Sequence, residues 1–134
     1  MFDSLDISSS ALTAQRTRLD TIAANIANAN TTRDASGKPN PYRRRFAVFA
    51  SGQPDDHKAP GVHVDQIRMD ETAFRKVSLP GHPDADKDGN VLFPNIEPAI
   101  ESVNALDASR AYEANVTAME VTKSMLNASL RLIA

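Results

Sequence analysis

Glycine and proline are confined to the middle of this 134-residue chain, and this confinement limits the fold more than any other feature. All five glycines and all eight prolines lie between residues 37 and 98. Inside a helix these residues cost about 1 and about 3 kcal/mol relative to alanine. Their absence from both ends therefore predicts an uninterrupted helix at each terminus, with turn-rich structure between the two helices.

The middle of the chain contains short runs of β-branched and aromatic residues separated by turn residues. These runs predict strands at residues 43–50, 61–69, 74–79 and 90–93. We therefore divide the chain into an N-terminal helix (1–32), a β-rich insert (33–98) and a C-terminal helix (99–134). The predicted fold is α+β: two long terminal helices pack as a coiled-coil-like hairpin, with the small insert between them.

The first helix has a regular but thin apolar seam. Large aliphatic residues recur every seven positions, with one more after the third: Leu5, Leu12, Leu19, Ile22 and Ile26. Polar residues occupy the intermediate seam positions, where a strong coiled coil would carry leucine. This pattern predicts a helix that depends on other surfaces for its stability.

Asparagines gather at the end of the first helix, at positions 25, 28 and 30. An asparagine on a helix seam can fix register and choice of partner, so Asn25 and Asn28 are candidates for that role. The simpler alternative is a polar face followed by a helix stop, because asparagine can adopt the left-handed conformation that closes a helix.

The last helix carries two apolar stripes. We name the first the inner stripe: Tyr112, Val116, Met119, Leu126, Leu130 and Ile133. The second, rotated from it, is the outer stripe: Ala114, Ala118, Val121, Met125, Ala128 and Leu132. A helix that is apolar around most of its circumference needs several neighbours, and one partner helix covers only one face. The termini therefore either form a hairpin with an open outer face or order fully only among other copies or chains.

Composition excludes several classes of function. The chain has no cysteine, which removes thiol catalysis, iron–sulfur clusters and cysteine-based zinc sites. Its 15 basic and 17 acidic residues provide no strong field toward nucleic acid or a membrane surface. The N-terminus lacks the basic and apolar regions of a cleaved secretory signal. No nucleophile-elbow spacing occurs, so we expect neither an enzyme nor a cofactor.

The segment from Asp84 to Asn90 resembles the first half of an EF-hand loop, with carboxylates at Asp84, Asp86 and Asp88 before a glycine. These three residues are weak candidates for a metal site and support an alternative function as a calcium-binding interaction protein. However, Asn95 stands where a bidentate glutamate is needed, and prolines flank the loop. A tight turn built on side-chain-to-backbone hydrogen bonds explains the same residues.

Two further groups of residues could bind a ligand. Arg43, Arg44 and Arg45 could hold a phosphate, but three cations on a strand more often form a solvated edge or face an acidic partner. The histidines at 57, 63 and 82 are too dispersed for a recognisable metal site.

Several segments together resemble one known family. Residues 11–19 and the run NIANANTT at 25–32 are similar to the N-terminal signature of bacterial flagellar rod and hook axial proteins. The segments that follow are similar to the proximal rod members: Pro41–Arg44, His82–Asp86, Pro94–Asn95, Ser109–Val116 and Lys123–Met125. The insertion RDASGKPN before Tyr42 also favours the proximal rod type over hook or distal rod proteins.

The resemblance implies a non-catalytic structural subunit of the proximal rod, a helical tube that crosses the periplasm as drive shaft and export channel. It implies synthesis in the cytoplasm and export through the flagellar type III apparatus without cleavage or membrane insertion. The implied partners are copies of the chain and rod subunits of the FlgB, FlgF, FlgG and FliE types, with both helices in the inner tube wall. The candidate packing residues are those of the first-helix seam, the inner stripe, Asn25 and Asn28.

Overall fold

The computed structural model describes residues 2–56 and 59–133 and has the element order expected from the sequence. Helix α1 covers Phe2–Ala27 and helix α2 covers Pro98–Ile133. Between them lie strands β1 (Arg45–Ser51), β2 (Val62–Met69), β3 (Arg75–Ser78) and β4 (Asn90–Phe93). The predicted α+β fold is confirmed, and the four expected strands are all present with ends shifted by two residues or fewer.

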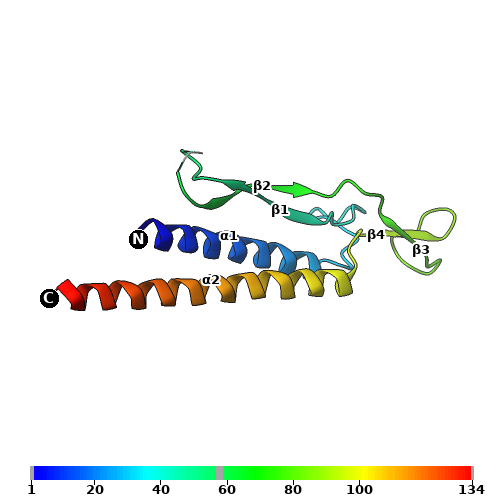
Figure 1. Cartoon of the computed structure of the whole chain (residues 1–134). Coiled ribbons are helices and arrows are strands. Elements are labelled where there is room, and N and C mark those ends of the chain that lie inside the picture. Colours follow the sequence, from blue (N-terminus) through cyan, green and yellow to red (C-terminus); the bar gives the residue numbers. More distant parts are fainter. Residues whose placement is uncertain (1, 57–58, 134) are drawn as a thin grey trace.

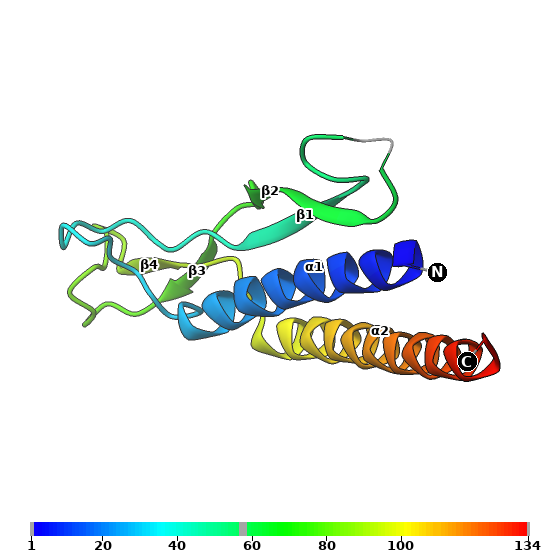
Figure 2. The same cartoon turned by 90° about the vertical axis from the view of Figure 1, so that its left-hand side faces the viewer.

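The elements form three layers, with α1 in the middle (Figures 1 and 2). Helices α1 and α2 run antiparallel along one face, and the β1–β2 hairpin covers the opposite face of α1. Among the elements of the described chain, α2 contacts only α1. The β3–β4 ribbon projects beyond one end of the pair of helices, the end where α1 stops and α2 starts. We call this end the base.

Small side chains let both neighbours approach α1 closely. Its buried residues include Ser8, Ala14 and Thr21, which leave little side-chain volume between the layers. The Oγ of Ser10 accepts a hydrogen bond of 3.1 Å from the backbone N–H of Val62 at the start of β2. Next to it, Gly61 has φ +126°, and a Cβ there would lie 2.7 Å from the same Oγ. Glycine is therefore required at this contact between α1 and the β1–β2 hairpin.

Near the base, the residues of α1 that face α2 no longer follow the seven-residue repeat of aliphatic side chains. Ile22 is buried, whereas Ile26 is 39% exposed and the seam continues through Asn25. A straight α-helix drifts by about 20° per heptad, so three heptads after Leu5 the side chain has rotated by about 60°. This drift explains why Ile26 leaves the seam and Asn25 enters it.

Helix α1 ends without the left-handed asparagine that the sequence suggested. Of the described residues, only glycines have positive φ. Instead, the Nδ2 of Asn28 donates a 2.8 Å hydrogen bond to the carbonyl of Ala24, and its Oδ1 accepts one from Thr31. The carbonyl of Ala24 also accepts the backbone N–H of Asn28 at 3.1 Å, so the side chain of Asn28 adds a second donor to the last turn of the helix.

The apolar core is thin. The buried apolar residues of the described chain are Ala14, Ile22, Ala29, Val91, Ile96 and Ala108. Half of these six are alanine, so the hairpin buries little apolar volume of its own. Meanwhile nine large apolar side chains of α2 are exposed: Ile100, Val103, Leu106, Tyr112, Val121, Met125, Leu130, Leu132 and Ile133.

Candidate functional site

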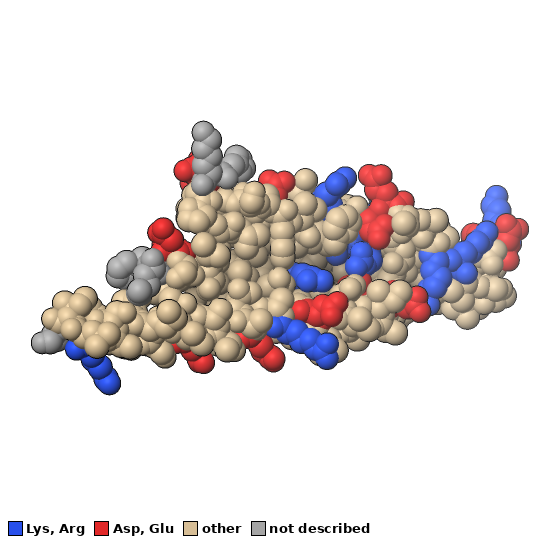
Figure 3. Space-filling view, in the orientation of Figure 1, with Lys and Arg blue, Asp and Glu red and all other residues tan. Residues whose placement is uncertain are grey.

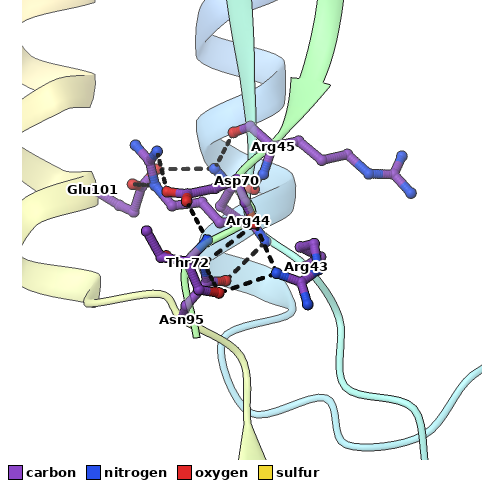
Figure 4. A network of polar contacts seen from close by, with 8 residues as sticks. Arg43, Arg44, Arg45, Asp70, Thr72, Asn95 and Glu101 are labelled. Carbon is purple, nitrogen blue, oxygen red and sulfur yellow. Dashed lines mark hydrogen bonds and ion pairs between the residues drawn. The ribbon is translucent and has the colours of Figure 1, made fainter. Parts of the chain in front are cut away.

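A cluster of buried and half-buried polar side chains joins the insert to both helices at the base (Figure 4). We call it the polar junction and define it by Asn25, Arg44, Asp70, Asn95 and Glu101. Glu101 is 1% exposed and Asn25 is completely buried. Burial of such groups is costly unless their hydrogen bonds are made, and here they are.

Glu101, in the first turns of α2, is the centre of the polar junction. Its Oε1 accepts a 2.6 Å hydrogen bond from the Nε of Arg44, and its Oε2 accepts one of 3.1 Å from the Nδ2 of Asn25. Asn25 also donates to the carbonyl of Arg45 at 2.7 Å and accepts from the N–H of Arg45 at 3.0 Å. One carboxylate and one amide therefore tie α1, α2 and β1 together.

Asp70 and Asn95 extend the junction to the end of β2 and the approach to α2. Asp70 Oδ2 lies 3.5 Å from Nη1 of Arg44, and its Oδ1 accepts the N–H of Thr72 at 3.0 Å. Hydrogen bonds from Thr72, and then the charge of Arg44, hold the pKa of the Asp70 carboxyl below its ordinary value. Asn95 accepts from the N–H of Arg44 at 3.2 Å and donates to Thr72 Oγ1 at 2.6 Å.

The three consecutive arginines differ in their surroundings: Arg43 and Arg44 are half-buried, and Arg45 is exposed. Arg43 donates to the carbonyls of Asp70 and Thr72 and lies 4.2 Å from the centre of the Phe74 ring. Arg44 is held by Asp70 and Glu101. The guanidinium of Arg45 lies over the Tyr42 ring at 5.4 Å. Of the three arginines, Arg44 has the acidic partner that the sequence suggested, and that partner lies within the chain.

The loop from Asp84 to Asn90 is a turn held by its own side chains. Asp84 accepts hydrogen bonds of 2.7 Å from Thr32 and from Arg33. The Oδ1 of Asp86 accepts the N–H groups of Asp88 and Asn90 at 2.9 Å, and Gly89 has φ +76°. These contacts follow the turn interpretation of the segment, and they use carboxylate oxygens that a calcium loop would need.

The carboxyl of Asp84 should make the stability of the fold depend on pH. Its hydrogen bonds from Arg33 and then Thr32 hold the pKa of its carboxyl below the ordinary value. A lowered folded pKa stabilises the fold above the unfolded value, near pH 4, and this contribution is lost as pH falls through the folded value. We expect Asp84→Asn to show a smaller loss of stability than the parent chain between about pH 5 and pH 2 in urea unfolding. The exposed Asp65→Asn variant is the control, and an equal slope in the Asp84→Asn variant would contradict the expectation.

The apolar stripes of α2 have different exposures. Every residue of the outer stripe is exposed, including Val121 at 54% and Met125 at 60%. In the inner stripe, Val116, Met119 and Leu126 are half-buried against α1, whereas Leu130 and Ile133 are exposed. In Figure 3 the left-hand end of the molecule, formed by the end of α2, shows few charged side chains. One partner helix thus leaves the outer stripe uncovered, as the sequence predicted.

The candidate packing residues fall into two groups. Leu5, Leu12 and Leu19 are half-buried along α1, and Ile26 and Tyr112 remain exposed. Asn25 is buried and donates hydrogen bonds to Arg45 and Glu101, so it joins the insert to both helices. Its role in the register between subunits stays a prediction. Packing of the other candidates between subunits stays a prediction.

Sequence reasoning did not find Glu101 or Asp70 as members of the polar junction. The sequence offered one signal for this pairing: Glu101 near the start of the last helix is an acidic residue that could pair with the three arginines at the start of the first strand. Of the histidines, His63 contacts the carbonyl of Gly52, His82 accepts the N–H of Asp84, and His57 lies outside the described residues. No group of three or more metal-ligating side chains occurs in residues 2–56 and 59–133.

The fold and the exposed faces together define a class of protein: a helical-hairpin subunit of a larger assembly. Neither helix, within the described chain, has the length and apolarity that crossing a membrane demands. The exposed faces of α2 are instead narrow stripes on an amphipathic helix, which is the form of a surface that packs on other helices.

Comparison with known proteins gives the family. A model described as flagella basal body rod protein matches residues 5–33, and one described as flagellar basal body rod FlgEFG protein C-terminal matches residues 87–132. The flagellar basal-body rod protein FlgC of Bacillus subtilis is 40% identical, covering 98% of this chain and 97% of the relative. FlgC of Yersinia enterocolitica is 41% identical over 95% of this chain and 93% of the relative. The chain belongs to the FlgC family of flagellar basal-body rod proteins, which are structural and non-enzymatic.

Proposed function

We propose that this rod protein occupies the proximal rod and places both helices in the inner wall of a helically arranged tube around the export channel. The observation that carries the proposal is the outer stripe, because a regular row of exposed apolar side chains on a paired helix needs a second neighbour. A heterologous contact that does not close generates a helical tube.

The proposed neighbours are further copies of this chain and rod subunits of the FlgB, FlgF, FlgG and FliE types. The β-rich insert would lie on the outside of the tube, since it covers the face of α1 opposite α2. Leu5, Leu12, Leu19 and the inner stripe would complete the packing wherever α1 and α2 leave them partly exposed.

The proposed route to the rod is the flagellar type III export apparatus, from the cytoplasm to the periplasm without cleavage. The thin core supports this route, because a hairpin that buries little apolar volume opens at low cost and can be threaded through a narrow channel. The polar junction would then re-form when the helices pair again.

Isolated basal bodies provide the test. We expect mass spectrometry of basal bodies purified from the source bacterium to find this chain with the N-terminal segment of residues 1–32 intact, and deletion of its gene to abolish swimming. Expression of the parent chain from a plasmid is the control and should restore both. Absence of the chain from basal bodies of swimming cells would contradict a place in the rod, and an N-terminus beginning after residue 10 would contradict uncleaved export.

A further inference from the structure

Two of the three consecutive arginines have no acidic partner within the described chain. Arg44 is held by Asp70 and Glu101, whereas Arg43 and Arg45 form no ion pair with an acidic side chain of residues 2–56 and 59–133. Arg43 donates to two backbone carbonyls, and Arg45 is exposed over a tyrosine ring. A guanidinium has five N–H donors, so both groups keep donors for a further acceptor.

The alternation of side chains along an extended segment explains this division. The N–H of Asp70 donates a 2.8 Å hydrogen bond to the carbonyl of Arg44, so the pairing with β2 begins one residue before β1. Successive side chains of an extended segment point to opposite sides. Arg44 therefore points toward Glu101. Arg43 and Arg45 lie on the other side of the segment, with their Cα atoms about 7 Å apart (Figure 4).

Arg43 and Arg45 line an open hollow of about 620 Å³ near the base. The guanidinium of Arg43 lies 4.2 Å from the centre of the Phe74 ring, and that of Arg45 lies 5.4 Å from the centre of the Tyr42 ring. These rings hold both cations in place. Met69, which is 56% exposed, adds an apolar wall. We call this site the arginine hollow and define it by Arg33, Tyr42, Arg43, Arg45, Met69 and Phe74.

The charges in and around the arginine hollow sum to a positive excess. Its acidic lining residue in the described chain is Asp34, whose Oδ1 already accepts the N–H groups of Ser36 and Lys38. Arg33 is paired with Asp84 at 2.7 Å. Four basic residues and one acidic residue are exposed within two positions of the lining residues: Lys38, Arg68, Arg75, Lys76 and Glu71. This excess favours an anionic ligand.

We propose that the arginine hollow binds an extended acidic segment of a partner protein, in which one residue separates two carboxylates. Such carboxylates lie about 7 Å apart on one side of the peptide, which equals the spacing of Arg43 and Arg45. Each guanidinium can hold one carboxylate through two parallel N–H groups. The exposed Met69 would contact an apolar side chain of the same segment. None of the described residues of α2 lines the hollow, so this inference goes beyond the proposed helix packing and does not depend on it.

Two peptides of equal composition test the spacing of the carboxylates. In acetyl-Ala-Glu-Ala-Glu-Ala-amide they lie on one side of an extended chain, and in acetyl-Ala-Glu-Glu-Ala-Ala-amide they lie on opposite sides. We expect the purified chain to bind the first peptide about fivefold more tightly, the equivalent of one exposed ion pair. NMR signals of the arginine Nε–H groups measure the titration, and the largest shifts should occur at Arg43 and Arg45.

Variants of the exposed Arg45 test the site itself. Arg45→Glu should weaken binding of the first peptide by about tenfold, because one ion pair is lost and a repulsion is added. Arg45→Lys keeps the charge without the paired donors and should give a smaller loss. Arg16→Glu makes the same change of charge at an exposed position of α1 outside the hollow and should change the affinity by less than about twofold. Circular dichroism verifies that each variant is folded.

Three results would overturn the proposal. The first is equal affinity for the two peptides, or the absence of shifts at Arg43 and Arg45. The second is an equal loss of binding in the Arg45→Glu and Arg16→Glu variants. The third is tighter binding of inorganic phosphate than of either peptide, which would assign the arginine hollow to a phosphate-bearing ligand.

Discussion

Replacing Glu101 with alanine should lower the free energy of unfolding by about 1.5–3 kcal/mol, the contribution of hydrogen bonds to a charged group. The substitution leaves the Arg44 guanidinium and the Nδ2 of Asn25 without their shared carboxylate. Arg44 would keep Asp70 at 3.5 Å and the Nδ2 of Asn25 would keep the carbonyl of Arg45, but each would lose a partner in a site that water reaches poorly. Urea unfolding followed by circular dichroism measures the loss.

Two variants make the Glu101 result specific to the polar junction. Glu113→Ala removes an exposed carboxylate from the same helix and should change stability by less than about 0.5 kcal/mol. Arg44→Ala combined with Glu101→Ala should cost less than the sum of the two single variants, because the pair is removed together. If Glu101→Ala behaves like Glu113→Ala, the junction contributes nothing to stability.

The elements were predictable because their signals are local. A helix is favoured where a long segment contains no glycine or proline. A strand is favoured where a short segment is rich in β-branched or aromatic residues. The boundaries at Arg45, Val62, Arg75 and Asn90 therefore lie within two residues of the expected positions. The exposure of the outer stripe was also predictable from the sequence. Its residues lie on a face of α2 that is rotated from the inner stripe, so a single partner helix cannot cover both.

The polar junction was not predictable from local pattern. Asn25 meets Arg45 across 20 positions and Glu101 across 76, and no spacing rule connects residues at such separations. The seam pattern also favoured Ile26 over Asn25, because a strict sevenfold repeat ignores the drift of a straight helix. Only the three-dimensional pairing of α1, α2 and β1 identifies which polar residues are buried together.

The division between a polar base and apolar stripes explains how one short chain can both fold and assemble. The junction joins polar groups of α1, α2 and the insert by hydrogen bonds, so it fixes how these elements pack without using many large apolar residues. Large apolar side chains are then left on the outside of α2, where they are available to neighbours. Under the proposed function, stability within the subunit therefore depends on the junction, whereas affinity between subunits depends largely on the outer stripe.

This separation leads to the second large effect: Val121→Asp combined with Met125→Asp should abolish swimming while leaving the free subunit folded. Both side chains are more than half exposed, so urea unfolding of the purified chain should change by less than about 0.5 kcal/mol per substitution. In the rod, each copy would instead bury two carboxylates against apolar neighbours. Each substitution would lose about 1.5–3 kcal/mol of apolar burial and add the cost of desolvating a charge.

Swimming in soft agar and the amount of chain in purified basal bodies measure the effect. The control is Val121→Leu combined with Met125→Leu, which keeps the outer stripe apolar and should swim normally. Because every copy in the rod carries the substitutions, the loss is repeated at each contact, and we expect no incorporation above background. Normal swimming of the aspartate variant would show that the outer stripe faces solvent in the rod, and the helices would then pack through the inner stripe alone.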